Sequence, residues 1–359
     1  MQWQPTYLSP IISEDISEII AADLPWQKLK SKTVLITGAN GFLPAYLVYS
    51  LLALNDCHNY SIKIIALVRD KVKAIQKFGD IVDRNDFELI IQDVSAPLTI
   101  QSKIDYIIHA ASQASPVFYG TDPVGTLAAN TIGTYNLLNF AVKNSVPNFL
   151  FFSSCEIYGE VSADKMPIKE TESGYIDIHN VRACYAESKR MAEVMCISFA
   201  HQYKIDVKIV RPFHTYGPGM SLNDGRVYAD FISDVVNNKD IRLKSDGTAT
   251  RAFCYLKDAT IGFLTVLLKG ENKEAYNIGN PNGEISIKDL ADTLVKLFPE
   301  KRLSVRFDPG MSTDKYLQSA IKRYSPSVTK IAALGWEPQT SVEKGFTRTI
   351  NYYTETGKS

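Results

Sequence analysis

The chain has few cysteines, no excess of charge of either sign and no long apolar run. Its five cysteines are scattered over 359 residues, odd in number and without metal-ligand spacing. This pattern predicts neither a disulfide framework nor a metal site, and it indicates a reducing cytosol. No apolar run approaches about 20 residues, and acidic residues stand where a secretory signal would be basic. We therefore expect an untargeted, cytoplasmic protein.

The charge balance and the composition narrow the classes of partner. The 39 basic and 39 acidic residues cancel, which argues against a nucleic-acid or anionic-membrane surface. Hydrophobic residues at 45% and charged residues at 22% are typical of an ordinary globular protein, and the length of 359 residues suggests one large or two modest domains. We expect small-molecule partners, with no nucleic acid and no membrane.

A glycine-bearing turn follows the first clear strand. Residues 33–47 read as a buried strand, a turn with Gly38 and Gly41, and a helix with Pro44 in its first turn. This order aims the helix N-terminus and free backbone N–H groups at a diphosphate, although a plain strand-to-helix turn is the alternative. The expected cofactor contacts in this turn are Gly38, Asn40, Gly41, Phe42 and Leu43.

Residues at the ends of the next strands are further candidates for cofactor contacts. The strand 62–68 ends at Val68, where an acid would normally bind the adenosine ribose, and Arg69 follows it. Because an arginine there can pair with a 2′-phosphate, NADP is an alternative to NAD. His109, at the end of a later strand, is interpreted as a packed residue. The other expected contacts are Asp93, Val94, Ala110, Ala111 and Ser112.

Strands and helices alternate through the first two thirds of the chain. Five strand–helix alternations are complete by residue 154, which predicts an α/β fold with a Rossmann-type, doubly wound parallel sheet. Residues 13–22 predict an amphipathic helix capped by Ser13 within an N-terminal helical extension, 1–30. We expect a cofactor domain over 31–211 and a smaller, interwoven α/β substrate domain over 212–359.

Tyr185 and Lys189 are spaced to lie on one face of a helix. The lysine ammonium beside the phenol would favour the ionised tyrosine, which could then take a proton from a hydroxyl. The phenol pKa would have to fall from about 10 toward neutrality for this role. Alone, the spacing also fits an ordinary amphipathic helix, but Ser154 and Glu156 end a strand about thirty residues earlier.

Seven motifs occur in order between about Thr33 and Tyr353. They are Thr37-Gly-x-x-Gly41, His109-Ala-Ala-Ser, Asn130-Thr-Ile-Gly-Thr, Ser153-Ser-Cys-Glu156-Ile-Tyr-Gly, Tyr185-x-x-x-Lys189, Arg211-Pro-x-x-x-Tyr216-Gly-Pro218 and Leu334-Gly-Trp336-Glu-Pro338. Together they resemble the extended short-chain dehydrogenases of the NAD-dependent epimerase/dehydratase family, which act on nucleotide sugars. Within it, UDP-glucuronate decarboxylases are most similar, through the run Arg182-Ala-Cys-Tyr185 among others, and dTDP-glucose 4,6-dehydratases are next.

The resemblance implies a redox-neutral lyase or isomerase that works through a 4-keto sugar. Tyr185 would take the proton of the sugar 4-hydroxyl while hydride passes to NAD. Lys189 would lower the phenol pKa, Ser154 would hold the hydroxyl, and Glu156 would act on the neighbouring C5. A 4-epimerase, a 4,6-dehydratase and a catalytically idle dinucleotide-binding scaffold or regulator remain alternatives.

Several positions depart from the decarboxylase pattern. Cys155 stands where dehydratases have an acid, while Asp177, Gly219 and His214 replace other decarboxylase residues, so the substrate need not be UDP-glucuronate. The expected substrate contacts are Ser115, Cys155, Asp177, His214, Arg226, Arg251 and Arg323. The resemblance also implies a homodimer, paired through the helix that carries Tyr185 and one neighbour.

Overall fold

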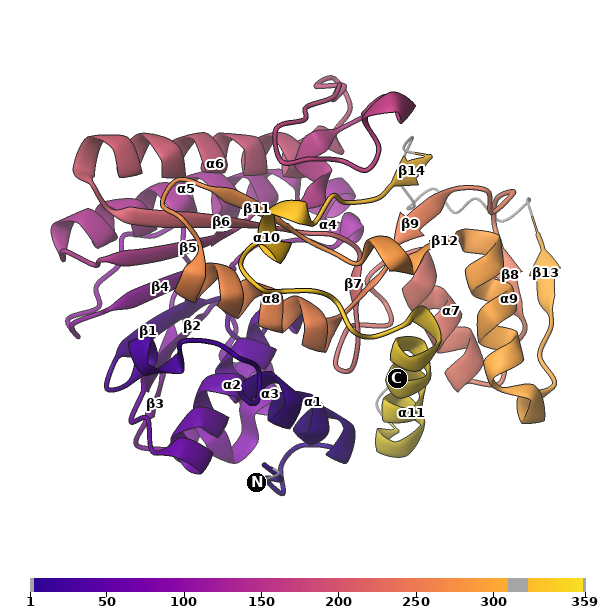
Figure 1. Ribbon diagram of the computed structural model, residues 1–359, viewed down its shortest axis with the longest axis horizontal. Coiled ribbons are helices and arrows are strands. Elements are labelled where there is room, and N and C mark those ends of the chain that lie inside the picture. Colours follow the sequence, from indigo (N-terminus) through magenta and orange to yellow (C-terminus); the bar gives the residue numbers. More distant parts are fainter. Residues whose placement is uncertain (1–2, 309–321, 358–359) are drawn as a thin grey trace.

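A seven-stranded parallel sheet forms the centre of the molecule (Figure 1). The computed structural model describes residues 3–308 and 322–357. The sheet order is β11-β6-β5-β4-β1-β2-β3, and each neighbouring pair is parallel. The strands are β1 (Thr33–Thr37), β2 (Lys63–Val68), β3 (Phe87–Ile91), β4 (Tyr106–His109), β5 (Asn148–Phe152), β6 (Asp206–Pro212) and β11 (Ala275–Ile278). The predicted doubly wound sheet is confirmed.

Helices cover both faces of this sheet. On one face lie α2 (Phe42–His58) and α8 (Leu256–Lys269), and on the other lie α5 (Pro123–Lys143) and α6 (Ala183–Tyr203) (Figure 1). The side chains of β1 alternate between the two, because successive strand residues point to opposite faces. Val34 and Ile36 belong to the hydrophobic cluster of α2 and α8, whereas Leu35 belongs to that of α5 and α6.

The C-terminal third forms a smaller group of helices and short sheets. It contains α7 (Val227–Val236), α9 (Ile287–Leu297), α10 (Thr329–Ala332), α11 (Val342–Thr356), β8 (Ile241–Leu243), β9 (Thr250–Ala252), β10 (Cys254–Tyr255), β12 (Glu284–Ser286), β13 (Val305–Phe307) and β14 (Arg323–Tyr324). Strand β10 pairs with β7 (Thr215–Tyr216). Because α8 and β11 return to the main sheet, the C-terminal part shares one hydrophobic cluster with it. The boundary at 211/212 stays a prediction.

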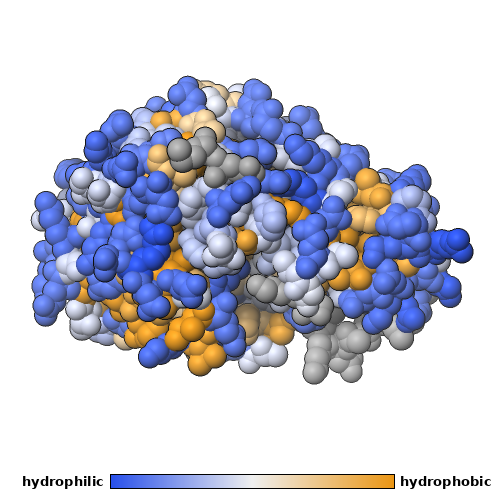
Figure 2. Space-filling view, turned by 90° about the horizontal axis from the view of Figure 1, so that it is seen from below, coloured by the Kyte–Doolittle hydropathy of each residue, from blue (hydrophilic) through white to orange (hydrophobic). Residues whose placement is uncertain are grey.

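The remaining elements are short connections between these layers. They are α3 (Lys71–Phe78), α4 (Pro116–Thr121) and the 3₁₀ turns Trp26–Leu29, Gly79–Asp83, Cys155–Tyr158, Ala163–Lys165, Pro281–Gly283 and Pro299–Lys301. Among the described helices, none is both long and apolar enough to cross a membrane. Figure 2 shows one face on which most side chains are hydrophilic and apolar side chains gather toward the lower left.

The N-terminal helix begins earlier than the sequence predicts. Helix α1 spans Pro10–Ile20, and the Ser9 hydroxyl caps it by accepting a hydrogen bond from the backbone N–H of Ile12. The assignment of Ser13 as the cap was therefore wrong. Pro10 suits the first helical position because it has no N–H to satisfy and its φ angle is already helical. Ser13 is instead buried inside the helix.

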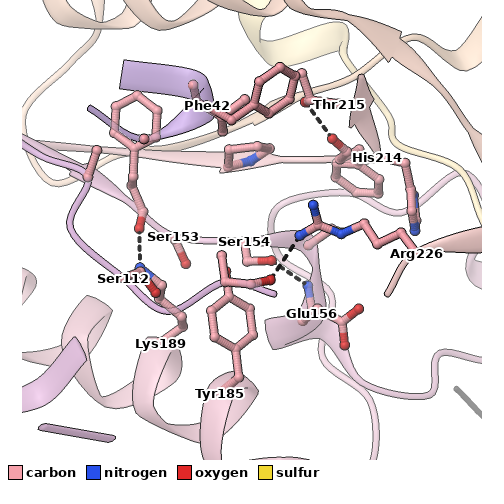
Figure 3. Close-up of a pocket in the computed structure, with 18 of the residues that line it drawn as sticks. Phe42, Ser112, Ser153, Ser154, Glu156, Tyr185, Lys189, His214, Thr215 and Arg226 are labelled. Atoms are coloured by element: carbon pink, nitrogen blue, oxygen red, sulfur yellow. Dashed lines mark hydrogen bonds between the residues drawn. The ribbon is translucent and has the colours of Figure 1, made fainter. Parts of the chain in front are cut away.

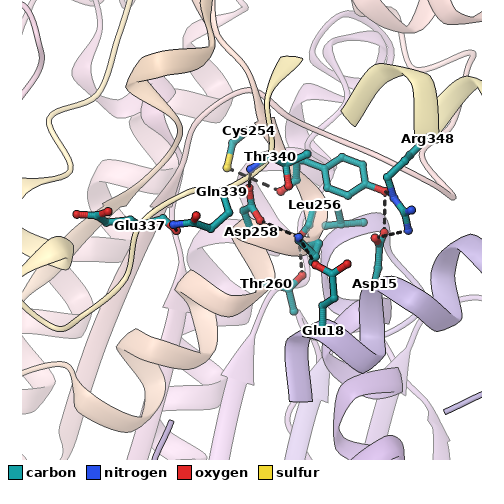
Figure 4. A network of polar contacts seen from close by, with 12 residues as sticks. Asp15, Glu18, Cys254, Leu256, Asp258, Thr260, Glu337, Gln339, Thr340 and Arg348 are labelled. Atoms are coloured by element: carbon teal, nitrogen blue, oxygen red, sulfur yellow. Dashed lines mark hydrogen bonds and ion pairs between the residues drawn. The ribbon is translucent and has the colours of Figure 1, made fainter. Parts of the chain in front are cut away.

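A buried carboxylate on α1 joins both parts of the molecule (Figure 4). Asp15, only 1% exposed, accepts a hydrogen bond from the hydroxyl of Tyr255 at 2.7 Å. It accepts another from the hydroxyl of Tyr46 at 3.1 Å. It also forms an ion pair with Arg348 of α11, at 2.8 Å. Burial raises the pKa of Asp15 to about 6, against the opposing charge of Arg348. Helix α1 thus connects α2 of the main sheet with α11 of the C-terminal group.

Candidate active site

A cavity of about 220 Å³ opens beyond the carboxyl ends of β1, β4, β5 and β6 (Figure 3). Parallel strands all end at the same edge of the sheet, so the segments that follow them gather there. Those segments, together with α6 and the start of α7, supply the walls of the cavity. The lining comprises residues 41–44, Ala110, Ser112, Ala114, Pro116, Tyr119, residues 152–156, Tyr185, Lys189, residues 212–215, Arg226 and Tyr228.

The glycine turn after β1 brings the backbone close to the neighbouring strand. Gly38 adopts a positive φ of 64°, and a Cβ atom there would lie 2.8 Å from the Cα of Ala111. Glycine is needed at this position because a larger residue would be strained and would clash. Gly41 is the N-cap of α2, and Phe42 and Leu43 line the cavity. This geometry suits the close approach of a dinucleotide phosphate to a helix N-terminus.

Three buried polar atoms of the cavity lining lack a hydrogen-bond partner among the described residues. They are the hydroxyls of Ser112 and Ser153 and the Nδ1 atom of His214. Buried polar groups are normally hydrogen-bonded, so these atoms fit a polar ligand. Burial, with the charges of Arg251 and Arg226, holds the pKa of His214 well below its usual value. The imidazole is therefore neutral at neutral pH. The lining as a whole fits a dinucleotide cofactor and a polar substrate.

Tyr185 and Lys189 project from α6 into this cavity (Figure 3). The Lys189 ammonium lies 5.9 Å from the centre of the Tyr185 ring and donates a hydrogen bond to the Phe152 carbonyl oxygen at 2.7 Å. Burial lowers the pKa of Lys189 to about 7. Burial also raises the pKa of Tyr185 to about 12, opposed by a hydrogen bond with Ser154 and by the charge of Arg226. The sequence predicts that Lys189 lowers the phenol pKa, whereas in this structure burial has the largest effect.

Glu156 lies beside Ser154 at the end of β5. Its backbone N–H donates to the Ser154 hydroxyl at 3.2 Å, because Ser154 caps a short 3₁₀ turn. Its carboxylate forms an ion pair with Arg182, with Nη2 and Oε1 at 3.7 Å. Burial, with the charge of Glu156, raises the pKa of the Cys155 thiol. Cys155 therefore lines the cavity as a neutral thiol.

Arg226 adds a guanidinium to the cavity lining, beside Ser154 and Glu156 (Figure 3). It precedes α7, and its Nη1 and Nη2 atoms donate to Asp224 (2.8 Å) and to the Ala114 carbonyl oxygen (2.9 Å). These two contacts fix the direction of the side chain. A cation held in this way can bind a phosphate or a carboxylate.

Four of the predicted substrate contacts lie outside the cavity lining. Ser115 caps α4 and donates to the carbonyl oxygen of Asp224, at 2.6 Å. Asp177 is exposed and accepts from the backbone N–H of His179. Arg251 donates to the carbonyl oxygen of Thr250, and Arg323, whose side chain is 51% exposed, forms an ion pair with Glu284. The roles of Ser115, Asp177, Arg251 and Arg323 stay predictions.

Several predicted cofactor contacts likewise lie outside the cavity lining. Arg69 and Asp93 follow the adjacent strands β2 and β3 and face each other, with Nη1 and Oδ2 at 3.9 Å. The side chain of Val94 is buried against Gly133 of α5. The predicted cofactor contacts outside the lining are Gly38, Asn40, Arg69, Asp93, Val94 and Ala111. Those within it are Gly41, Phe42, Leu43, Ala110, Ser112 and Lys189.

Sequence reasoning missed two side chains that contact predicted catalytic residues: Tyr119 contacts Tyr185, and Arg182 contacts Glu156. The ring of Tyr119 stacks on that of Tyr185, with centroids 4.9 Å apart and 19° between the planes. The guanidinium of Arg182 lies 5.6 Å from the centre of the Tyr119 ring. Arg182 is the first residue of the Arg182-Ala-Cys-Tyr185 run, so its closeness in sequence to Tyr185 was a signal that could have identified it. Tyr119 belongs to none of the recognised motifs.

A family sequence model decides the relationship of this chain to known proteins. The model of the NAD dependent epimerase/dehydratase family matches residues 34–279. The chain belongs to this family. Helix α1 precedes the matched residues, whereas the glycine turn, Ser154, Tyr185, Lys189 and Arg226 fall within them.

Named members of the family are similar over most of the chain. UDP-glucuronic acid decarboxylase 5 of Arabidopsis thaliana is 33% identical over 313 residues, which are 87% of this chain and 86% of that protein. UDP-glucuronic acid decarboxylase 1 of Danio rerio is 34% identical over 323 residues, 90% of this chain and 72% of that protein.

Solved structures of family members share the fold. An epimerase from Methanothermobacter thermautotrophicus superposes with a TM-score of 0.78 at 22% identity and covers 97% of each chain. A UDP-glucuronic acid 4-epimerase from Bacillus cereus, in complex with UDP-glucuronic acid and NAD, gives a TM-score of 0.73 at 22% identity. It covers 90% of this chain and 99% of the other. At these identities the likeness shows the fold alone.

Proposed function

We propose that the protein is a nucleotide-sugar enzyme that transiently oxidises the sugar C4 hydroxyl with bound NAD and acts through a 4-keto intermediate. Among known reactions of this kind, the proposed one is most like the decarboxylation of UDP-glucuronate. The observation that carries this proposal is that Ser154, Glu156, Tyr185 and Lys189 meet in one cavity beside the glycine turn. The decarboxylase relatives, at 33–34% identity over most of the chain, support it.

Oxidation at C4 requires a base for the hydroxyl proton. NAD, when bound, supplies an acceptor that takes the hydride from C4 and later returns it. Tyr185 accepts the hydroxyl proton, and the neighbouring Ser154 hydroxyl orients the sugar oxygen. The charge of Arg226 and the hydrogen bond with Ser154 favour the ionised phenol, against the larger effect of burial, and the Lys189 amine lies 5.9 Å from the centre of the Tyr185 ring.

The 4-ketone then makes the bond to the C5 carboxyl carbon labile. That bond breaks and CO₂ leaves. The electron pair of the broken bond passes through C5 to the ketone oxygen, which gives an enolate. C5 next takes a proton, and the ketone reforms. Glu156, next to Ser154 in the cavity wall, is the group we assign to this stage. Return of the hydride to C4 and of the proton from Tyr185 to the oxygen leaves a pentose and no net oxidation.

Three alternatives are weighed against decarboxylation. A 4,6-dehydratase needs an acid to protonate the departing hydroxyl, and the buried Cys155 thiol, with its raised pKa, is a poor one. A 4-epimerase would not need Glu156. A catalytically idle scaffold or regulator would have no need of a buried lysine beside Tyr185. Asp177, whose carboxylate would repel an acidic sugar if it faced the substrate, lies outside the cavity lining, and its role stays a prediction.

Mass analysis of reaction products tests this assignment. The purified protein is incubated with UDP-glucuronate and with other UDP-, dTDP-, CDP- and GDP-sugars. Loss of CO₂ supports decarboxylation, loss of water indicates a dehydratase, and an unchanged mass with a new stereoisomer indicates an epimerase. If no sugar reacts and no dinucleotide co-purifies, the scaffold alternative replaces the proposal. The co-purified cofactor also shows whether Arg69 accepts the 2′-phosphate of NADP in place of NAD.

The proposed assembly is a cytoplasmic homodimer formed through α5 and α6. These helices pack together on one face of the sheet and carry large apolar side chains that are more than a third exposed. Exposed apolar surface of this extent is typical of a protein–protein interface. The side chains are Val124, Leu127, Ile132 and Tyr135 on α5, and Met191, Val194, Ile197 and Tyr203 on α6.

A further inference from the structure

The Tyr185 ring has a neighbour that fixes its orientation. Tyr119 of α4 stacks on it almost in parallel, and the Tyr119 side chain is itself buried, at 2% exposure. The Tyr119 hydroxyl donates to the carbonyl oxygen of Ala114 at 3.0 Å. An aromatic ring held at both its face and its hydroxyl has little freedom to turn. The stacked Tyr185 ring therefore meets a fixed surface on one side.

Arg182 links this pair of rings with Glu156. Its guanidinium lies over the Tyr119 ring, and its Nη2 atom is 3.7 Å from the Glu156 carboxylate. A planar guanidinium can stack on an aromatic face and pair with a carboxylate at the same time, which a lysine ammonium does less well. The side chain is only 18% exposed, so solvent screens this ion pair less than a surface pair.

The same group of residues extends to Arg226. The Ala114 carbonyl oxygen accepts hydrogen bonds from both Tyr119 and Arg226. Continuous contacts therefore run from Glu156 through Arg182 and Tyr119 to Tyr185, with a branch to Arg226. Glu156 and Tyr185 come from different elements, and this set of contacts fixes the separation between them.

We propose that Arg182 and Tyr119 are positioning residues that hold the Glu156 carboxylate and the Tyr185 phenol at a fixed separation in the cavity. This inference rests on the proposed function, in which Tyr185 serves the hydride steps at C4 and Glu156 serves the stage between them at C5. Loss of Arg182 then impairs chiefly the middle stage, because Glu156 loses its partner while Tyr185 keeps its stack. Loss of the Tyr119 ring impairs the first hydride step, because the phenol loses its fixed surface.

Single-turnover measurements of reduced cofactor and of product separate these effects. In Arg182→Gln we expect reduced cofactor to form within about threefold of the wild-type rate and to accumulate, while product forms about 10- to 100-fold more slowly. Arg182→Lys keeps the charge and should recover part of the product rate. Tyr119→Leu should slow the first hydride step about tenfold or more, whereas Tyr119→Phe, which keeps the ring, should slow it less.

A matched control removes an ion-paired arginine elsewhere. Arg306 lies on β13, has a 69% exposed side chain and forms an ion pair with Asp240. Arg306→Gln removes this guanidinium and should leave both rates unchanged. Equal slowing of the two rates in Arg182→Gln, with no recovery in Arg182→Lys, would indicate a merely structural role and overturn the proposal.

A signal that does not depend on turnover separates this inference from the proposed function. In protein labelled with ¹³C at the tyrosine ζ carbon, Tyr185→Phe identifies the Tyr185 resonance. Removal of the stacked ring in Tyr119→Leu should move that resonance. Loss of the guanidinium that lies over the Tyr119 ring, in Arg182→Gln, should also move it, while Arg306→Gln should not. If wild-type protein transforms no nucleotide sugar but the resonance moves as expected, the proposed function fails and the positioning stands. If neither variant moves it, the positioning fails.

Discussion

Lys189 donates a buried hydrogen bond to the backbone carbonyl oxygen of Phe152, at 2.7 Å. Phe152 is the last residue of β5, and Ser154 and Glu156 lie in the segment that follows it. The contact therefore ties the helix that carries Tyr185 to the strand end that carries two other proposed catalytic groups. Because the Lys189 side chain is 2% exposed, its amine is held away from water as well.

Replacement of Lys189 by methionine should separate its catalytic role from its structural effect. We expect Lys189→Met to lose at least about 100-fold in turnover, because the phenol loses its neighbouring cation and the helix loses its tie to β5. The pKa of Lys189 in the folded protein is lowered, so the unfolded chain binds the extra proton between about pH 7 and the ordinary lysine range. Wild-type stability should therefore rise over that interval relative to the variant. Denaturant unfolding at pH 6.5, 8 and 9.5 measures this difference, and parallel curves would contradict it.

Tyr185→Phe should abolish turnover while leaving binding of the cofactor and of the nucleotide sugar within about threefold. The substitution removes one hydroxyl and keeps the ring that stacks on Tyr119. Calorimetric titration and product analysis check the two halves of this prediction. Tyr175→Phe alters a tyrosine outside the cavity lining that is 68% exposed, and it serves as the control. Unchanged turnover in Tyr185→Phe would refute the assigned base.

Asp15 should make stability fall as pH rises toward neutrality. Its pKa is raised to about 6 by burial, so the folded protein binds a proton that the unfolded chain has lost above about pH 4. The contribution of this group is fully present below about pH 4 and is lost as pH rises through 6. At 1.36 kcal/mol per pKa unit, the effect is on the order of 3 kcal/mol.

Denaturant unfolding of Asp15→Asn checks this pH dependence. The stability of the variant relative to wild type should improve between pH 4 and pH 7, since asparagine does not titrate. Tyr255→Phe is the companion variant: it removes a hydrogen bond that lowers the Asp15 pKa, and should therefore move the transition to higher pH. A pH-independent difference between Asp15→Asn and wild type would show that the carboxyl keeps its ordinary pKa.

A charge in the apolar surface of α6 should dissociate the proposed dimer. Val194 is 59% exposed on that helix, and Val194→Glu would bury an unpaired carboxylate in an interface. Light scattering coupled to size exclusion should report a dimer for wild type and a monomer for the variant. Val72→Glu, at a 65% exposed position on α3, is the matched control. A wild-type monomer at micromolar concentration would contradict the assembly.

The sheet and much of the cavity wall could be predicted because both depend on regular patterns. Buried strands alternate with helices, and parallel strands place the residues that follow them at one edge of the sheet. Gly41, Ser112, Ser154 and Tyr185 line one cavity at that edge, and their roles stay predictions. The spacing of Tyr185 and Lys189 also holds, since both lie on one helix face.

Contacts between distant segments could not be predicted in this way. The stack of Tyr119 on Tyr185 depends on how the short helix α4 is placed against α6, and no sequence period records that placement. The pKa of Tyr185 was expected to fall, but burial depends on every segment that closes over the ring. The start of α1 was missed because Ser9 and Ser13 can each cap a helix. Pro10, at the first helical position, favours Ser9 as the cap.

The carboxylate of Asp15 determines where the chain can be shortened. Helix α1 lies before residue 34, where the family match begins, so a shortened protein that starts near that residue would look complete by comparison with the family. It would nevertheless leave the hydroxyls of Tyr46 and Tyr255 and the guanidinium of Arg348 facing an apolar gap without their common acceptor. Helix α1 is thus part of the folding unit, and an affinity tag should not replace it.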